Sequence, residues 1–198
     1  MTMNTRLFTA LAVPVLALSV SGCGINSVPT AEENAKAKWA NVQADYQRRA
    51  DLIPNLVETV KGFAKQESTV LTQVTEARAK ASSIQVSAAD LSDPAKVAAF
   101  QQAQGALSQS LGRLLATAEA YPDLKSNQNF LALQSQLEGT ENRINVSIKD
   151  YNESVQSYNT TIRTFPDAIG AKIFYGSKPM ETFKATTPNA DHAPAVKF

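Results

Sequence analysis

Two long stretches without proline most strongly constrain how this chain folds. Prolines flank residues 55–93 and 123–165 but do not occur within them. Because proline costs about 3 kcal/mol inside a helix, long helices are expected in such stretches. Apolar residues recur through both at alternating steps of three and four, the spacing that places side chains on one face of a helix. The sequence therefore predicts long amphipathic helices.

The first apolar stripe extends from Trp39 to Ile84 and passes a proline. Pro54 lies on the flank of the stripe and removes the helical hydrogen bond to the carbonyl of Ala50. The continuous register favours a kink there, whereas Asp51 as a fresh N-cap favours a break, and both alternatives stay open. The predicted fold is all-α: an antiparallel bundle of three to four long helices, the first one kinked or broken near Pro54.

Capping signals predict where the helices begin. Thr30 and Glu33 have the spacing of a capping box, so the first helix is expected to start at Thr30. Asp93 followed by Pro94 is an N-cap with proline at the first helical position. A last long helix is expected from about residue 124 to residue 164.

The first 22 residues have the composition of a bacterial secretion signal. Arg6 precedes an apolar run at residues 7–20, which suits a signal-peptide core and is short for a membrane span. The run ends in Val-Ser-Gly-Cys, which resembles a lipobox, and Cys23 is the only cysteine of the chain. We expect residues 1–22 to be a lipoprotein signal peptide cleaved between Gly22 and Cys23, with lipid on the Cys23 thiol. A plain secretion signal with a chance cysteine is the alternative.

Lipidation at Cys23 implies a position at an envelope membrane, facing the periplasm. Acyl chains such as palmitate contribute roughly 0.8 kcal/mol per buried methylene, so a multiply acylated cysteine anchors a protein firmly. Residue 24 is Gly. In lipoproteins of the kind this chain resembles, Asp at that position favours retention in the inner membrane, so the outer membrane is the expected location.

The rest of the chain divides into a tether, a bundle and a tail. Residues 23–29 are expected to connect the lipid to the bundle, which spans residues 30–183. The short apolar segment 171–175 is expected to form a hydrophobic flap. Residues 184–198 are rich in polar residues and proline, so a disordered tail is expected there.

Composition argues against several classes of function. The chain carries 19 basic and 18 acidic side chains, a balance unlike that of nucleic-acid-binding proteins. One cysteine and one histidine are too few for a structural zinc site or a redox pair. His192 lies in the tail, away from any core nucleophile, and we expect no metal and no cofactor. The remaining catalytic alternative is an enzyme that uses carboxylates such as Glu67 or Glu141. We expect instead that the protein is not an enzyme.

Charged residues on or beside the apolar stripes are the most informative polar positions. They are Arg48, Arg49, Glu67, Glu141 and Arg143. A lone charge is costly to bury, so each is expected to find a partner or reach solvent. Arg143 can hold a carboxylate at two points. We therefore expect a structural ion pair between Glu67 and Arg143 that fixes helix register, and a ligand-binding role for these charges is the alternative.

Three asparagines and two tyrosines of the last predicted helix are open to the same two interpretations. They form either hydrogen bonds within the bundle or part of a recognition site. They are Asn142, Asn152, Asn159, Tyr151 and Tyr158.

Three segments resemble the LemA family. They are RRADLIPNLVETVKGFA at residues 48–64, YPDLKSN at 121–127 with TENRI at 140–144, and YN at 151–152 with YNT at 158–160 and FP at 165–166. The resemblance covers about residues 39–183. It implies an all-helical bundle held at a bacterial envelope membrane, and it implies no particular reaction. Family members usually begin with an uncleaved transmembrane helix, whereas this chain has the lipobox in its place.

The expected function is that of a non-catalytic envelope lipoprotein of the LemA type. Its bundle is expected to act as a scaffold or to bind protein partners, of unknown identity, at the membrane. The alternative is a periplasmic binding module for a small molecule, a lipid or a cell-wall fragment, which requires a pocket between facing helices. An exposed apolar or charged stripe over a solid core favours the first function, and an enclosed polar cavity favours the second.

Overall fold

The computed structural model describes residues 23–64 and 66–184, and these are largely helical. Four helices are long, namely α2 (Cys23–Phe63), α3 (Ser68–Ser83), α4 (Pro94–Ala118) and α6 (Gln128–Thr161). Four elements are short, namely the 3₁₀ helix η1 (Ala88–Ser92), α5 (Pro122–Lys125), α7 (Asp167–Gly170) and the π-helical turn η2 (Ala171–Tyr175). No strand occurs within the described ranges, and the prediction of an all-α bundle is confirmed.

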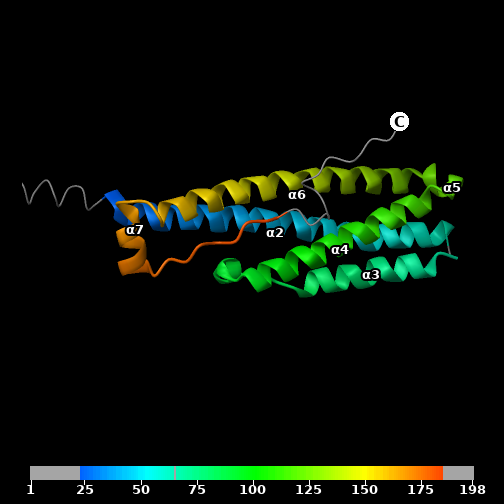
Figure 1. The fold of residues 1–198 in the computed structure, drawn as a ribbon. Helices are drawn as coiled ribbons and strands as arrows, with labels where there is room; N and C mark the ends of the chain where they lie inside the picture. Colours follow the sequence, from blue (N-terminus) through cyan, green and yellow to red (C-terminus); the bar gives the residue numbers. More distant parts are fainter. Residues whose placement is uncertain (1–22, 65, 185–198) are drawn as a thin grey trace, which may run out of the picture.

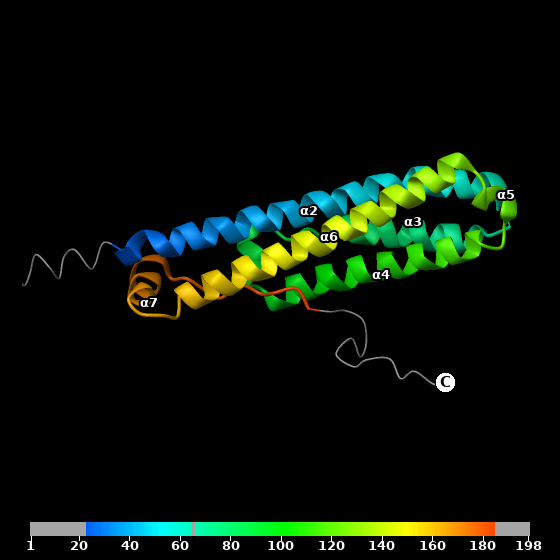
Figure 2. The same cartoon turned by 90° about the horizontal axis from the view of Figure 1, so that it is seen from above.

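Successive long helices run in opposite directions (Figures 1 and 2). Helices α2 and α6 lie side by side, and α3 and α4 pack against them in one half of the bundle. In the other half, the extended segment at residues 176–184, which we call the strap, runs along the bundle. We call the end where α2 begins and α7 lies the proximal end, and the end at α5 the distal end.

Buried side chains form two hydrophobic clusters, one in each half. The proximal cluster is rich in aromatic residues and includes Trp39, Tyr46, Phe100, Tyr151 and Tyr158, with Phe183 packed against it. The distal cluster is mainly aliphatic and includes Ile53, Leu56, Val60, Leu71, Val74, Leu107, Leu111, Leu114, Leu124, Phe130 and Leu137. The predicted apolar stripes supply most members of both clusters.

Helix α2 passes through Pro54 without a break. Proline leaves the carbonyl of Ala50 without its helical donor. The Nε of Arg78, on α3, donates a hydrogen bond to this carbonyl at 2.7 Å. A neighbouring helix therefore supplies the donor that Pro54 removes, and the alternative of a break at Pro54 is wrong.

The first predicted stripe is instead interrupted after Phe63. The Phe63 side chain is exposed, and Ala64 takes the buried position. The chain resumes as α3 at Ser68, with Glu67 as its N-cap residue, and runs antiparallel to α2. Apolar periodicity indicates which residues are buried but not the direction of the chain. The same three-and-four spacing therefore continues from α2 into α3, although a turn separates the two helices.

Helix α2 begins earlier than its capping signal predicts. It starts at Cys23, so the expected tether at residues 23–29 is helical. The hydroxyl of Thr30 donates to the carbonyl of Asn26 at 2.6 Å within the helix and does not cap it. Val28 is fully buried in the proximal cluster. Tertiary packing therefore extends the helix beyond the start at Thr30 that local signals predict.

Other helix ends follow their local signals. Asp93 caps α4, and its side chain accepts hydrogen bonds from the next two free backbone N–H groups. Asn127 caps α6 in the same way, so the expected last helix is divided into α5 and α6.

The expected flap at residues 171–175 is the turn η2. The expected signal peptide and residues 185–198 of the expected tail lie outside the described residues.

Candidate functional site

A buried arginine lies between the two hydrophobic clusters. Arg49 of α2 is only 2% exposed. Its Nη1 donates to the Ser108 hydroxyl at 2.7 Å and to Glu141 Oε2 at 3.1 Å. Its Nη2 donates to Gln104 Oε1 at 2.7 Å and to the Gln104 carbonyl at 3.3 Å. One guanidinium group thus joins α2, α4 and α6.

The environment of this arginine stabilises its charge. Glu141 provides a carboxylate whose side chain is 47% exposed, so this ion pair is partly hydrated. The ring of Tyr46 lies 4.9 Å from the Arg49 guanidinium carbon, within range of a cation–π interaction. Burial raises the pKa of Tyr46 to about 12, an effect that the nearby Arg49 opposes. The tyrosine therefore stays neutral beside the arginine at physiological pH.

Gln104 extends the same network to the fourth long helix. Its Nε2 donates to the carbonyl of Ala81 on α3 at 3.4 Å. All four long helices are therefore linked at the level of Arg49, and we call Arg49, Gln104, Ser108 and Glu141 the polar layer. Because a buried arginine without partners is strongly destabilising, sliding one helix by a turn would be costly. We therefore infer that the polar layer helps to fix the register of the bundle.

The predicted ion pair between Glu67 and Arg143 is not formed. Glu67 lies at the start of α3 and accepts a hydrogen bond from the Tyr121 hydroxyl at 2.9 Å, which raises the pKa of Tyr121. Arg143 is exposed near the middle of α6. Arg49 and Glu141, two other charged residues on or beside the predicted apolar stripes, do form an ion pair.

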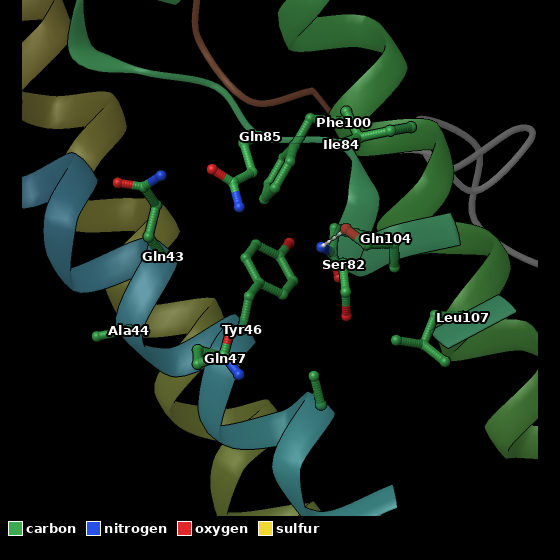
Figure 3. Close-up of a pocket in the computed structure, with 12 residues that line it drawn as sticks. Gln43, Ala44, Tyr46, Gln47, Ser82, Ile84, Gln85, Phe100, Gln104 and Leu107 are labelled. Carbon is green, nitrogen blue, oxygen red and sulfur yellow. Dashed lines mark hydrogen bonds between the residues drawn. The ribbon is translucent and has the colours of Figure 1, made fainter. Parts of the chain in front are cut away.

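A pocket opens between α2, α3 and α4 next to the polar layer (Figure 3). Its volume is about 380 Å³, which is within the range of small-molecule sites. Glutamines dominate its polar lining, and the residues with polar side chains are Gln43, Gln47, Gln85, Gln104, Ser82 and Tyr46. Most of these are exposed, so the pocket is open to solvent. Amide groups both donate and accept hydrogen bonds, which suits an uncharged polar ligand.

Two asparagines of α6 hold the strap. Asn152 accepts from the backbone N–H of Phe183 at 2.8 Å and donates to its carbonyl at 3.1 Å. Asn159 makes the same pair of bonds with Met180, both at 2.9 Å. Each side-chain amide thus takes the place of a neighbouring strand. The N–H and carbonyl groups of these extended residues find hydrogen-bond partners without a β-sheet.

Two tyrosines of α6 complete the attachment of the strap. The Tyr151 hydroxyl donates to the Glu181 carbonyl at 2.9 Å, and that of Tyr158 donates to the Lys178 carbonyl at 3.1 Å. Burial raises the pKa of both tyrosines. The Phe183 ring packs 5.7 to 6.5 Å, between centroids, from Trp39, Tyr46, Phe100 and Tyr151. The structural interpretation therefore holds for both tyrosines and for the two asparagines that bind the strap.

Sequence reasoning missed two features of this region. Gln104 and Ser108 were not expected as partners of Arg49. Gln104 nevertheless falls between Phe100 and Leu107 at the spacing of four and three that apolar residues keep on one helix face, which is a visible signal of a buried polar contact. The strap was not expected either, because an extended segment has no helical periodicity. Asn142, grouped with the strap-binding asparagines in the sequence, is exposed on α6.

The proximal end holds the expected lipid site. Cys23 is the first residue of α2, and Gly22 lies outside the described residues. Within residues 23–64 and 66–184, no helix is sufficiently long and apolar to span a bilayer. In the same ranges, no three His, Cys, Asp or Glu side chains are grouped so as to hold a metal ion.

Comparison with known proteins places this architecture among relatives. The model of the LemA family matches residues 38–198. The chain is 28% identical over 125 residues to a protein named LemA from Metamycoplasma hominis, covering 63% of this chain and 52% of that protein. It is 27% identical over 157 residues to the magnetosome protein MamQ of Magnetospirillum gryphiswaldense and to MamQ 2 of Paramagnetospirillum magneticum, covering 71% of this chain and 58% of each relative. The chain thus spans little more than half the length of these relatives.

Proposed function

The chain belongs to the LemA family. From this membership, and from the lipobox-like sequence that ends in Cys23, we propose that it is a non-catalytic, lipid-anchored protein of the bacterial envelope. In this proposal Cys23 carries the lipid, and the bundle faces the periplasm, with the outer membrane as the favoured location. The bundle acts there as a scaffold or protein-binding module.

The polar layer is the observation that supports a scaffold. Arg49 directs its guanidinium Nη atoms to partners inside the bundle, and the carboxylates of Glu67 and Glu141 are hydrogen-bonded to Tyr121 and Arg49. General acid–base catalysis requires a carboxylate that exchanges a proton with a substrate, whereas these two carboxylates accept hydrogen bonds from donors of the bundle itself. The result is a rigid body about 60 Å long, from the 41 residues of α2 at 1.5 Å each.

The lipid anchor is tested by detergent phase partitioning of the full chain expressed in its native host. We expect the unmodified chain to enter the detergent phase and Cys23→Ala to stay in the aqueous phase. Ala40→Ser, at an exposed position of the same helix, is the matched control. Equal partitioning of Cys23→Ala and the unmodified chain would refute the anchor.

The scaffold role is tested by chemical crosslinking in intact cells, followed by purification of the chain. We expect defined envelope proteins to be crosslinked to the unmodified chain and to the Ala40→Ser control, and to be lost with Cys23→Ala. A chain that crosslinks to no protein above the level of an unrelated lipoprotein contradicts this role.

The glutamine-lined pocket favours a second function, the binding of a small polar molecule such as a soluble cell-wall fragment. Calorimetric titration with soluble cell-wall fragments tests it. Gln85→Leu alters an exposed residue that lines the pocket, and Gln109→Leu alters an exposed glutamine of α4 that does not. If the pocket binds such a fragment, Gln85→Leu should weaken the binding about tenfold, because one good polar contact is worth about that factor. Gln109→Leu should leave the binding unchanged. Equal binding by both variants contradicts this function.

A further inference from the structure

Exposed apolar side chains gather at the proximal end of the bundle. Of the eight large hydrophobic residues exposed in the described part of the chain, five lie within residues 165–175: Phe165, Ile169, Ile173, Phe174 and Tyr175. Their exposed fractions range from 42% for Tyr175 to 79% for Phe165. Single exposed apolar residues are ordinary, whereas a cluster of this kind marks an interaction surface. We call these five residues the proximal patch.

The backbone that carries the patch is anchored to the bundle. Gly170 and Ala171 are buried between exposed neighbours. The Ser27 hydroxyl hydrogen-bonds to Asp167 of α7, so the first turns of α2 contact the patch-bearing segment. The apolar side chains are therefore presented outward by a segment that is itself packed.

The chain enters the bundle at this same end. Helix α2 begins at Cys23, and α7 lies beside its first turns (Figures 1 and 2). The sequence before Cys23 contains the apolar run at residues 7–20. A membrane attachment through a lipid on Cys23 and one through that apolar run would both lie at the start of α2. In either case the membrane would adjoin the proximal end of the bundle and not the distal end.

The segment at residues 163–178, which carries the patch, has more basic than acidic side chains. Arg163, Lys172 and Lys178 are exposed on either side of or within the patch-bearing segment. Asp167 is the one acidic residue between positions 163 and 178, and it is engaged with Ser27. Basic side chains beside apolar ones are typical of surfaces that lie in the boundary between lipid headgroups and acyl chains.

We propose that the proximal patch inserts into the headgroup region of the membrane that holds the N-terminus. The bundle then contacts the bilayer at two points, the N-terminal anchor and the patch, with lipid phosphates bound by the neighbouring basic residues. A single flexible lipid would leave a long rod free to tilt, whereas a second contact sets its orientation and directs the distal end away from the membrane. This inference rests on the membrane attachment in the proposed function.

Fluorescent labelling of single introduced cysteines tests the proposal. The full chain is reconstituted into vesicles of phosphatidylethanolamine and phosphatidylglycerol, with an environment-sensitive fluorophore attached to Ile173→Cys or Phe174→Cys. Leu131→Cys is the matched control, because Leu131 is also an exposed apolar residue, at 48%, but lies in the first turn of α6, next to α5 at the distal end. The chain without an added cysteine measures any labelling of Cys23.

We expect blue-shifted emission, quenched by lipids brominated on their acyl chains, at positions 173 and 174, and neither effect at position 131. Substituting Lys172→Glu together with Lys178→Glu is expected to reduce the quenching at position 174. Water-like emission at 173 and 174, in a chain that still sediments with vesicles, overturns the patch contact and leaves the anchor intact. Failure to sediment overturns both.

A second copy of the chain is the competing occupant of the patch. In that case the emission at positions 173 and 174 is blue-shifted but not quenched by brominated lipids, and unlabelled Phe174→Cys forms disulfide-linked dimers that Leu131→Cys does not. This combination of results overturns the membrane contact.

Discussion

The distal and proximal halves of the bundle are closed in different ways. Four long helices surround the aliphatic distal cluster, whereas the aromatic proximal cluster lies between α2, α6, the first turns of α4, η1 and the strap. Helices satisfy most of their own backbone hydrogen bonds, so the distal half depends mainly on apolar side chains at the right spacing. An extended segment does not, so the proximal half requires polar side chains at defined positions.

Asn152 and Asn159 show what this requirement means in the sequence. Each binds the N–H and the carbonyl of one strap residue, and the backbone N–H of Glu181 donates to the carbonyl of Leu91 at 2.8 Å. Large rings fill the remaining space: Trp39 lies 5.4 Å, between ring centroids, from both Phe100 and Tyr151. The stability of the proximal half is therefore expected to depend on single polar side chains as well as on packed volume, and that of the distal half mainly on packed volume.

The largest effect is expected from Trp39→Ala in the proximal half. This change removes a fully buried ring and one of the two side-chain donors to the carbonyl of Val86, the other being Gln43. The free energy of unfolding should fall by about 3–5 kcal/mol, measured by urea denaturation and circular dichroism. Ala40→Phe, at an exposed site on the same helix, should change it little. A loss below about 1 kcal/mol for Trp39→Ala would show that the aromatic cluster contributes little to stability.

In the distal half, Leu137→Ala is expected to lower the free energy of unfolding by about 2–5 kcal/mol, because Leu137 is buried in the aliphatic cluster. Leu131→Ala, on the same helix but exposed, is the control and should cost less than about 0.5 kcal/mol. Amide exchange in the strap should be unaffected by Leu137→Ala. Faster exchange there would mean that the two halves unfold as one unit.

Between the halves, Arg49→Met is expected to cost about 1–3 kcal/mol, because it leaves the polar groups of Gln104 and Ser108 without their donor. A double-mutant cycle with Glu141→Gln measures the ion pair. We expect a coupling energy of about 1 kcal/mol or less, since Glu141 is half exposed and its interaction is screened. A coupling energy several times larger would contradict the conclusion that the Glu141 carboxylate is partly hydrated and its interaction with Arg49 screened.

For the strap, Asn152→Leu is expected to release residues near Phe183, because two backbone groups lose their partners at once. Hydrogen exchange of the strap amides should accelerate while that of α3 and α4 stays unchanged. Asn142→Leu, an exposed asparagine of the same helix, is the control. Equal exchange in the two variants would show that the strap is held by Phe183 packing alone.

The smallest expected effect is an alkaline loss of stability in the proximal half. Burial raises the pKa of Tyr46 from its usual 10 to about 12. The contribution of neutral Tyr46 is therefore complete below pH 10 and is lost as the pH rises from 10 to 12, because the unfolded chain releases its proton first. Melting temperatures at pH 9 and pH 11 measure it. Tyr46→Phe should narrow the difference, and Tyr175→Phe, at an exposed site, should not.

Local patterns along the chain were sufficient to predict the all-α class, the capping of α4 by Asp93 and the burial of stripe residues such as Leu137. Each of these depends on residues close together in the sequence. The same patterns predicted a pair of Glu67 with Arg143, because Glu67 lies on one apolar stripe and Arg143 lies beside another. Stripe periodicity contains no information on which stripe faces which.

Only the tertiary structure decided how the seams meet. Helix α2 continues through Pro54, and the carbonyl of Ala50 that loses its helical donor there accepts a hydrogen bond from Arg78 on another helix. Arg49 finds its partners on α4 and α6, and the strap lies where two asparagines two helical turns apart face it. These contacts join residues that are distant in sequence, so their partners are selected by the packing of whole helices and not by any local preference of the chain.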